Sequence, residues 1–302
     1  MTTTVRVPAK INVSLAVGPL GEDGFHSLAT VYQAVSLYDE VTARPSDDAE
    51  LHVQVHFEGL EREGSVPLDG DNLAVRAARL LREETGVDEG VVLAIRKAIP
   101  VAGGMAGGSA DAAGALVACN DLWGTGLTRP ELVELAAALG SDVPFSLTGG
   151  IAMGSGHGEV VSPVLASGTY HWVFAISDEG LSTPTVYAEL DRLRHDDDVA
   201  TPEVPSSILT ALRAGDPEAL GASLSNDLER AAFSLRPGLR ETLRAGRSAG
   251  ALGAMVSGSG PTVMFLAADE AHAADLAAFL EGSDAVTEVV QAYGPVPGAR
   301  IV

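Results

Sequence analysis

The chain has 302 residues, of which 46% are hydrophobic, and a formal net charge of −22. This length usually corresponds to two domains, each large enough to bury its own core. The acidic balance argues against a nucleic-acid partner, because no basic patch offsets repulsion by a polyanion. No apolar run approaches the ~20 residues of a membrane helix, and the single cysteine excludes an intramolecular disulfide. Together these features predict a cytoplasmic protein that binds no membrane.

Alternation of apolar and polar residues predicts four strands in the first part of the chain, at residues 4–7 (ending at Pro8), 11–17, 31–37 and 51–57. Helical spacing over residues 72–84 ends near Gly86, and a strand over 91–99 follows. A further helix is expected over residues 112–122. Thr128 and Glu131 form a capping box for the next helix.

A glycine-rich segment over residues 149–158 is expected to close a first domain of residues 1–163, leaving 164–302 as the second. A strand over residues 170–177 opens the second domain. Ser182 and Pro184 then begin a helix that includes Tyr187. The remaining elements predicted are helical segments over 206–250, strands at 254–256 and 262–266, a helix at 270–280 and a strand at 286–292.

Residues 100–113, PVAGGMAGGSADAA, form the most unusual stretch of the sequence. Its four glycines precede a predicted helix, so bare backbone N–H groups lie at a helix start, where they suit an anion such as phosphate. The stretch lacks the Gly-Lys-Ser/Thr of a Walker A loop and the spacing of the dinucleotide fingerprint. A flexible linker is the alternative, although the Ala-rich helical sequence that follows argues against it.

Lys10 and Lys97 are the only lysines in a chain that otherwise uses arginine. Lys10 separates two apolar strand segments, and its compact charge suits a hydroxyl or phosphate oxygen; the alternative is a strand-edge lysine that prevents aggregation. Asp142, in a Gly-Ser-Asp-Val-Pro turn, could accept a proton from an acceptor hydroxyl. Its alternative role is the N-cap of a helix at Pro144.

Three segments in order resemble the motifs of the GHMP kinases: PAKINVSL at residues 8–15, the glycine stretch at 100–113, and SGSGPTV at 257–263. The resemblance spans nearly the whole chain. It implies an α+β fold of two domains, a ribosomal protein S5 domain 2-like N-terminal domain for ATP and catalysis and a ferredoxin-like C-terminal domain that closes on the substrate. The active site would lie between them.

Two further segments, DGFHSLATVYQAVSL at residues 23–37 and LGSDVPF at 139–145, resemble one branch of that family. This branch uses ATP to phosphorylate the 2-hydroxyl of a CDP-linked methylerythritol on the non-mevalonate route to isoprenoid precursors. Two alternatives stay open: a family member acting on a mevalonate-like or homoserine-like alcohol, and a catalytically silent nucleotide-binding protein on the same fold. The sequence does not indicate an oligomeric state.

The resemblance also assigns roles to individual residues. Lys10 and Asp142 match the catalytic pair, with Asp142 as the base, and Ser109 is expected near Mg²⁺. The residues expected to bind the substrate are Asn12, Phe25, His26, Tyr32, Tyr187, Gly258, Ser259 and Gly260. Those expected to bind ATP are Asn72, Lys97, Pro100, Val101, Ala102, Gly103, Gly104, Met105, Ala106, Gly107, Gly108, Ser109 and Ala110.

Some residues depart from the family pattern. Ala102, Met105 and Ala106 stand where Gly, Leu and Gly are commoner, Ala110 replaces a second serine, and Phe25 stands where tyrosine is usual. The loop changes are small and compatible with phosphate binding by the backbone. Phe25 keeps the ability to stack on cytosine but loses any contact of a phenol, and a magnesium contact through a hydroxyl at position 110 is impossible.

Overall fold

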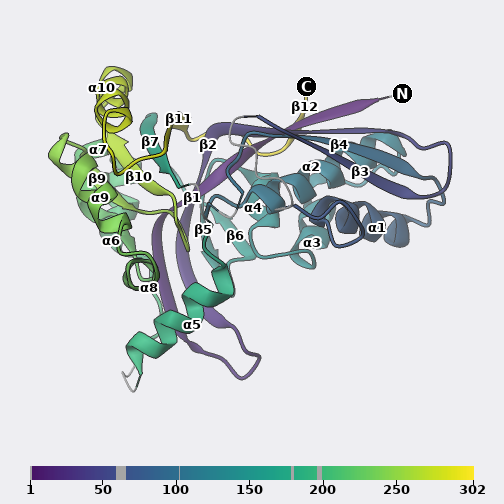
Figure 1. Ribbon diagram of the computed structural model, residues 1–302. Coiled ribbons are helices and arrows are strands. Elements are labelled where there is room, and N and C mark those ends of the chain that lie inside the picture. Colours follow the sequence, from purple (N-terminus) through teal and green to yellow (C-terminus); the bar gives the residue numbers. More distant parts are fainter. Residues whose placement is uncertain (1, 59–65, 102, 178–179, 196–198) are drawn as a thin grey trace.

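The computed structural model describes residues 2–58, 66–101, 103–177, 180–195 and 199–302 (Figure 1). Within these ranges the strands form two sheets. The first sheet has the order β12-β1-β2-β4-β3, with β5, β6 and β8 attached to it, and the second has the order β11-β7-β10-β9. The chain thus has the mixed α+β architecture expected from the sequence.

The first sheet is built on a long hairpin of β1 (Thr3–Leu20) and β2 (His26–Pro45). The predicted end of a strand at Pro8 is wrong, because β1 continues through it. The pairing with β2 shifts register between Pro8 and Ala9, and such a bulge is where a strand accommodates a proline. The other strands of this sheet beside the hairpin are β3 (Leu51–Phe57), β4 (Val91–Lys97), β5 (Ile151–Ser155) and β6 (Val160–Pro163).

Four helices lie together against the first sheet (Figure 1): α1 (Leu73–Thr85), α2 (Gly107–Leu122), α3 (Arg129–Ala137) and α4 (Val143–Thr148). Asn72 caps α1 by accepting from the N–H of Ala74, and Gly86 ends the helix in the left-handed conformation. The predicted capping box of Thr128 and Glu131 is present. Helix α2 is apolar nearly all round, and it is buried between the sheet and the other helices.

The second sheet comprises β7 (Tyr170–Ile176), β9 (Gly253–Val256), β10 (Val263–Ala267) and β11 (Glu288–Gly294). All its strand pairs are antiparallel. Across the sheet, the strands that lie side by side are the fourth, first, third and second in chain order. Helix α10 (Glu270–Glu281) lies in the chain between β10 and β11. That order is the ferredoxin-like arrangement expected for the second domain.

The remaining elements of the described residues are helices that follow β7 and two short strands. Helices α5 (Thr183–Arg194), α6 (Ser206–Ala214), α7 (Pro217–Ser223), α8 (Glu229–Leu235) and α9 (Leu239–Ser248) follow β7. Two short strands, β8 (Ser225–Asn226) and β12 (Arg300–Ile301), return to pair with β1. The division at residue 163 stays a prediction, and it separates β8 and β12 from the sheet to which they contribute. None of the helices in the described ranges has the length and apolar character needed to span a membrane.

Ala106 begins helix α2 in an uncommon backbone conformation. It occupies the N-cap position with φ of 58°, in the left-handed region, and its side chain makes no capping hydrogen bond. A residue with a Cβ pays about 1–2 kcal/mol for this conformation, whereas glycine adopts it freely. The departure from glycine noted in the sequence therefore carries a conformational cost.

Replacing Ala106→Gly should raise the free energy of unfolding by about 1 kcal/mol, because the strain exceeds the entropy that glycine adds to the unfolded chain. Urea denaturation measures the change. The control is Ala274→Gly, an exposed position inside α10, which should lower the free energy by about 1 kcal/mol. Equal destabilisation by both substitutions would contradict a left-handed Ala106.

Candidate active site

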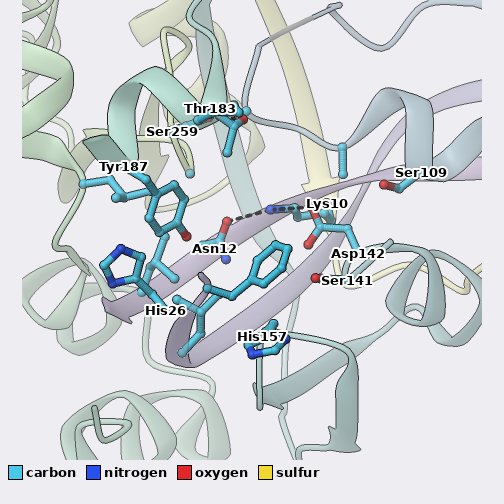
Figure 2. Close-up of a pocket in the computed structure, with 18 of the residues that line it drawn as sticks. Lys10, Asn12, His26, Ser109, Ser141, Asp142, His157, Thr183, Tyr187 and Ser259 are labelled. Atoms are coloured by element: carbon cyan, nitrogen blue, oxygen red, sulfur yellow. Dashed lines mark hydrogen bonds and ion pairs between the residues drawn. The ribbon is translucent and has the colours of Figure 1, made fainter. Parts of the chain in front are cut away.

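A cavity of about 780 Å³ lies where β1, the β1–β2 turn, the glycine stretch, α4, α5 and the turn before β10 meet (Figure 2). Lys10 and Asp142 line it together. So do most of the residues expected to bind the substrate or ATP: Asn12, Phe25, His26, Tyr32, Tyr187, Gly258, Ser259, Pro100, Gly103, Gly104, Ala106, Gly107, Gly108 and Ser109. Its wall does not include Asn72, Lys97, Val101, Met105, Ala110 or Gly260. Ala102 lies outside the described residues.

Lys10 lies at the centre of the cavity wall, on β1. Its side-chain nitrogen donates to Oδ1 of Asn12 at 2.8 Å and lies 3.3 Å from Oδ2 of Asp142, as Figure 2 shows. It also lies 5.3 Å from the ring centre of Tyr32. Because the residue is only 7% exposed, the alternative of a lysine guarding an exposed strand edge is wrong.

Asp142 occupies the N-cap position of α4 but does not cap it. Its backbone is helical, with φ of −86° and ψ of −12°, and its side chain makes no capping hydrogen bond. The carboxylate is instead paired with Lys10 across the cavity wall. The N-cap role considered from the sequence therefore applies to the position of Asp142 and not to its side chain.

Asn12 is held in one orientation by a chain of hydrogen bonds. Its amide nitrogen donates to the hydroxyl of Thr30 at 2.7 Å, and that hydroxyl donates to the carbonyl of Ser14 at 2.6 Å. Because the amide nitrogen is engaged there, Oδ1 faces Lys10. Asn12 thus fixes the direction of the lysine side chain.

His26 has one satisfied and one unsatisfied ring nitrogen. Nδ1 lies 2.9 Å from the carbonyl oxygen of Gly18, which can only accept, so Nδ1 carries the proton. Nε2 is buried without a hydrogen-bond partner, and in the neutral ring it is an acceptor. Asp191 lies 3.3 Å from Nε2 and could pair with it only if the ring were protonated.

Two tyrosines contribute to the cavity in different ways. Tyr187 stacks on His26, with ring centres 5.3 Å apart, and forms an aromatic wall. Burial, followed by the charge of Asp142, raises the pKa of Tyr187 to about 12, so its phenol stays neutral. Tyr32 is almost completely buried and packs on Phe145. It is chiefly a core residue, and its ring lies beside the ammonium group of Lys10.

The glycine stretch lies against the turn between β9 and β10, which begins at Ser257. Ser257 donates from its hydroxyl to the carbonyl of Gly104, and any Cβ at Gly104 would collide with the Ser257 carbonyl. The N–H of Lys10 donates to the carbonyl of Met105 at 3.2 Å, while the Met105 side chain enters the core. This packing presents the first turn of α2, including Gly108 and Ser109, to the cavity.

Lys97 is buried beside the glycine stretch and is only 3% exposed. Its nitrogen lies 2.6 Å from Oδ2 of Asp39 and 2.7 Å from Oδ2 of Asp111. Burial opposes the charge, but the carboxylates of Asp111 and Asp39 outweigh it and raise the pKa of Lys97. Burial also raises the pKa of Asp111 well above its usual value. A structural role for Lys97 is therefore clear, while its expected place near adenine stays a prediction.

The chemistry of the cavity wall fits a magnesium ion brought in with a polyphosphate. Mg²⁺ prefers oxygen ligands and usually takes few from the protein, because phosphates and water supply the others. The hydroxyl of Ser109 and the carboxylate of Asp142 both line the cavity. Among the described residues, no group of three or more His, Cys, Asp or Glu side chains is arranged to hold a metal by itself.

The sequence interpretation missed several residues of this wall. His157 and Ser141 come from the glycine-rich segments around α4 and β5, and Thr183 and Asp191 come from α5. Thr183 lies with its hydroxyl 3.0 Å from that of Ser259. Thr183 lies between Ser182 and Pro184 at the predicted helix start, and the Gly-His-Gly sequence around His157 is the one local signal for that residue.

Comparison with known proteins agrees with this architecture. Models of the GHMP kinases N terminal domain and the GHMP kinases C terminal region match residues 72–150 and 208–284. Proteins of Thermobifida fusca and Streptomyces coelicolor, both named 4-diphosphocytidyl-2-C-methyl-D-erythritol kinase, are 55% and 54% identical. Each match covers 100% of this chain, and 98% and 100% of the relative.

Solved structures give the same result. A crystal structure of 4-(cytidine 5'-diphospho)-2C-methyl-D-erythritol kinase is 33% identical, with a TM-score of 0.76 over 96% of this chain and 98% of that one. A homoserine kinase from Cytophaga hutchinsonii, at 20% identity over 100% and 97% of the two chains, shares the fold with a TM-score of 0.72. The two-domain fold expected from the motifs is thus confirmed. The chain belongs to the GHMP kinase family, in the branch whose members are named 4-diphosphocytidyl-2-C-methyl-D-erythritol kinase.

Proposed function

We propose that the protein uses ATP to phosphorylate the 2-hydroxyl of 4-diphosphocytidyl-2-C-methyl-D-erythritol, in the non-mevalonate route to isoprenoid precursors. The observation that carries this proposal is one cavity that joins the Lys10–Asp142 pair to a phosphate-binding helix start and to an aromatic wall with an unsatisfied histidine nitrogen. The names of relatives 55% and 54% identical support the same substrate.

Asp142 is the proposed base and Lys10 its partner. The carboxylate accepts the proton of the acceptor hydroxyl while the oxygen attacks the γ-phosphoryl group and ADP leaves. Lys10 stabilises the negative charge on Asp142 and contacts the acceptor oxygen, and Asn12 keeps the ammonium group directed there. Intact Lys10 and Asp142 argue against the alternative of a silent nucleotide-binding protein.

The start of α2 is the proposed phosphate site. The left-handed Ala106 makes no side-chain cap, so the N–H groups of Gly107, Gly108 and Ser109 and the helix dipole are available to anionic oxygens. Ser109 would hold the Mg²⁺ that accompanies ATP. When bound, that ion neutralises charge on the β- and γ-phosphate oxygens.

His26 and the aromatic rings account for the cytidine. In the neutral tautomer, Nε2 of His26 accepts from the 4-amino group of cytosine, and this contact gives a hydrogen bond to a buried atom that otherwise makes none. Tyr187 and Phe25 offer ring faces for stacking. A mevalonate-like or homoserine-like substrate has no base and would leave Nε2 unsatisfied.

A cytoplasmic location is part of this proposal. The single cysteine, Cys119, is fully buried in α2, and burial raises the pKa of its thiol. It therefore stays protonated and acts as a small apolar core residue. This agrees with a reducing compartment, where a free thiol is usual.

Purified protein should release ADP from ATP and magnesium when given CDP-methylerythritol, and much more slowly when given mevalonate or homoserine. A coupled assay for ADP follows all three reactions at the same enzyme concentration. No release with the cytidine compound, or faster release with either other alcohol, rejects the proposed substrate.

Asp142→Asn should abolish turnover and leave ATP affinity nearly unchanged, because the amide cannot accept the hydroxyl proton but keeps the shape of the site. Steady-state kinetics and ATP titration calorimetry measure the two effects. Asp48→Asn is the control, since Asp48 lies on an exposed loop away from the cavity. Near-normal turnover of Asp142→Asn would remove Asp142 as the base.

A UDP-linked analogue of the substrate should have a kcat/KM about 10- to 100-fold lower than the CDP-linked compound. Uracil presents a carbonyl oxygen where cytosine has its amino group, so two acceptors would face each other at His26. His26→Ala should lower kcat/KM for the cytidine compound and reduce the discrimination. Equal rates for the two compounds with the unaltered enzyme would contradict the assigned tautomer and its role.

A further inference from the structure

Phe25 is an exposed aromatic residue whose backbone is better held than its ring. It lies in the turn between β1 and β2 and is 62% exposed. Its N–H donates to Oδ1 of Asp23 at 3.0 Å, and its carbonyl accepts from the N–H of Gly21 at 2.7 Å. These bonds fix the path of the turn, but a phenylalanine ring on such a turn still needs a neighbour to fix its rotamer.

His157 is that neighbour. It lies between β5 and β6, far from Phe25 in sequence, and the two ring centres are 5.2 Å apart with their planes at 30°. Its Nε2 lies 3.1 Å from Oδ2 of Asp23, so one carboxylate contacts both the backbone of Phe25 and the ring beside it. Phe25 and His157 both line the cavity.

The backbone of the His157 turn is itself anchored. The N–H of His157 donates to Oε2 of Glu159 at 2.8 Å, and the carbonyl of Gly156 accepts from the N–H of Leu28 at 2.8 Å. The second bond ties the turn to Leu28 of β2, the strand that begins at His26. Figure 2 shows His26 and Tyr187 together on one side of the cavity, with His157 on another.

We propose that His157 is a positioning residue for the nucleotide substrate, which holds the ring of Phe25 where it stacks on cytosine, opposite the wall of His26 and Tyr187. This inference rests on the proposed function. A free Phe25 ring would have to be ordered when the substrate binds, and His157 orders it in advance. The ring contact should matter more than the ion pair, because an exposed pair such as His157–Asp23 stabilises little.

His157→Ala should raise KM for CDP-methylerythritol about three- to tenfold, the cost of ordering one side chain on binding, while kcat and KM for ATP stay unchanged. His157→Phe should restore KM, since a second aromatic ring replaces the contact without the charge. Binding of CDP, measured by titration calorimetry, should weaken and recover in the same order. CDP carries the base and diphosphate but no acceptor alcohol.

His52→Ala is the matched control. His52 forms a similar exposed pair with Asp48, with side chains 47% and 55% exposed against 41% and 55% for His157 and Asp23, and it lies on β3 away from the cavity. Its loss should change neither constant. The inference is overturned if His157→Ala leaves KM for the cytidine compound unchanged, raises KM for ATP equally, or is not rescued by phenylalanine.

CDP binding separates failure of this inference from failure of the proposed function. An enzyme that binds CDP through His157 but does not phosphorylate CDP-methylerythritol would retain the inference and reject the proposed reaction. Normal turnover with a His157→Ala variant that binds CDP as well as the unaltered enzyme would do the reverse. Absence of CDP binding to the unaltered enzyme overturns the inference.

Discussion

A buried ammonium group between two carboxylates fixes the chain where it enters the glycine stretch. Lys97 ends β4, Asp39 lies on β2 and Asp111 lies in the second turn of α2, so one cluster joins three elements. The other oxygen of Asp39 accepts from the N–H groups of Ala98 and Ile99. Removing Lys97 would leave two buried carboxyl groups without their counter-charge, at a cost of about 3–5 kcal/mol. The loop therefore starts from a rigid base.

The two lysines of the chain have different roles, because their side chains have different surroundings. Lys97 is enclosed, and it binds the carboxyl groups of Asp39 and Asp111, which are themselves buried. Lys10 faces the cavity, where Asn12 and Asp142 hold it within reach of an incoming oxygen. A compact ammonium suits both positions, since a planar guanidinium would need a wider space in either.

Local signals in the sequence predicted the elements whose ends depend on nearby residues. The capping box at Thr128 and the helix preceding Gly86 formed as expected, because their hydrogen bonds join residues within a few positions. The predicted strand end at Pro8 was wrong, because whether a proline ends a strand or sits in a bulge depends on the partner strand.

The part of the candidate site that could be predicted from the sequence is the part that lies in recognisable motifs. Lys10, Asp142 and the four glycines of the glycine stretch line one cavity. Contacts between distant segments were inaccessible from local patterns: the pairing of Asp23 with His157 joins two turns that only the folded sheet brings together. The enclosure of Lys97 by Asp39 and Asp111 was equally hidden, because charged residues on a strand usually indicate a solvent-exposed face.

The return of β12 to β1 has a consequence for how the protein is made. Val5 pairs with Ile301, so β1 receives this neighbour only after all the residues between them have been translated. Until then, that end of β1 presents unpaired backbone groups on which other chains can assemble. The ferredoxin-like unit is therefore synthesised while β1 still has an open edge, and that edge closes only once β12 has been made.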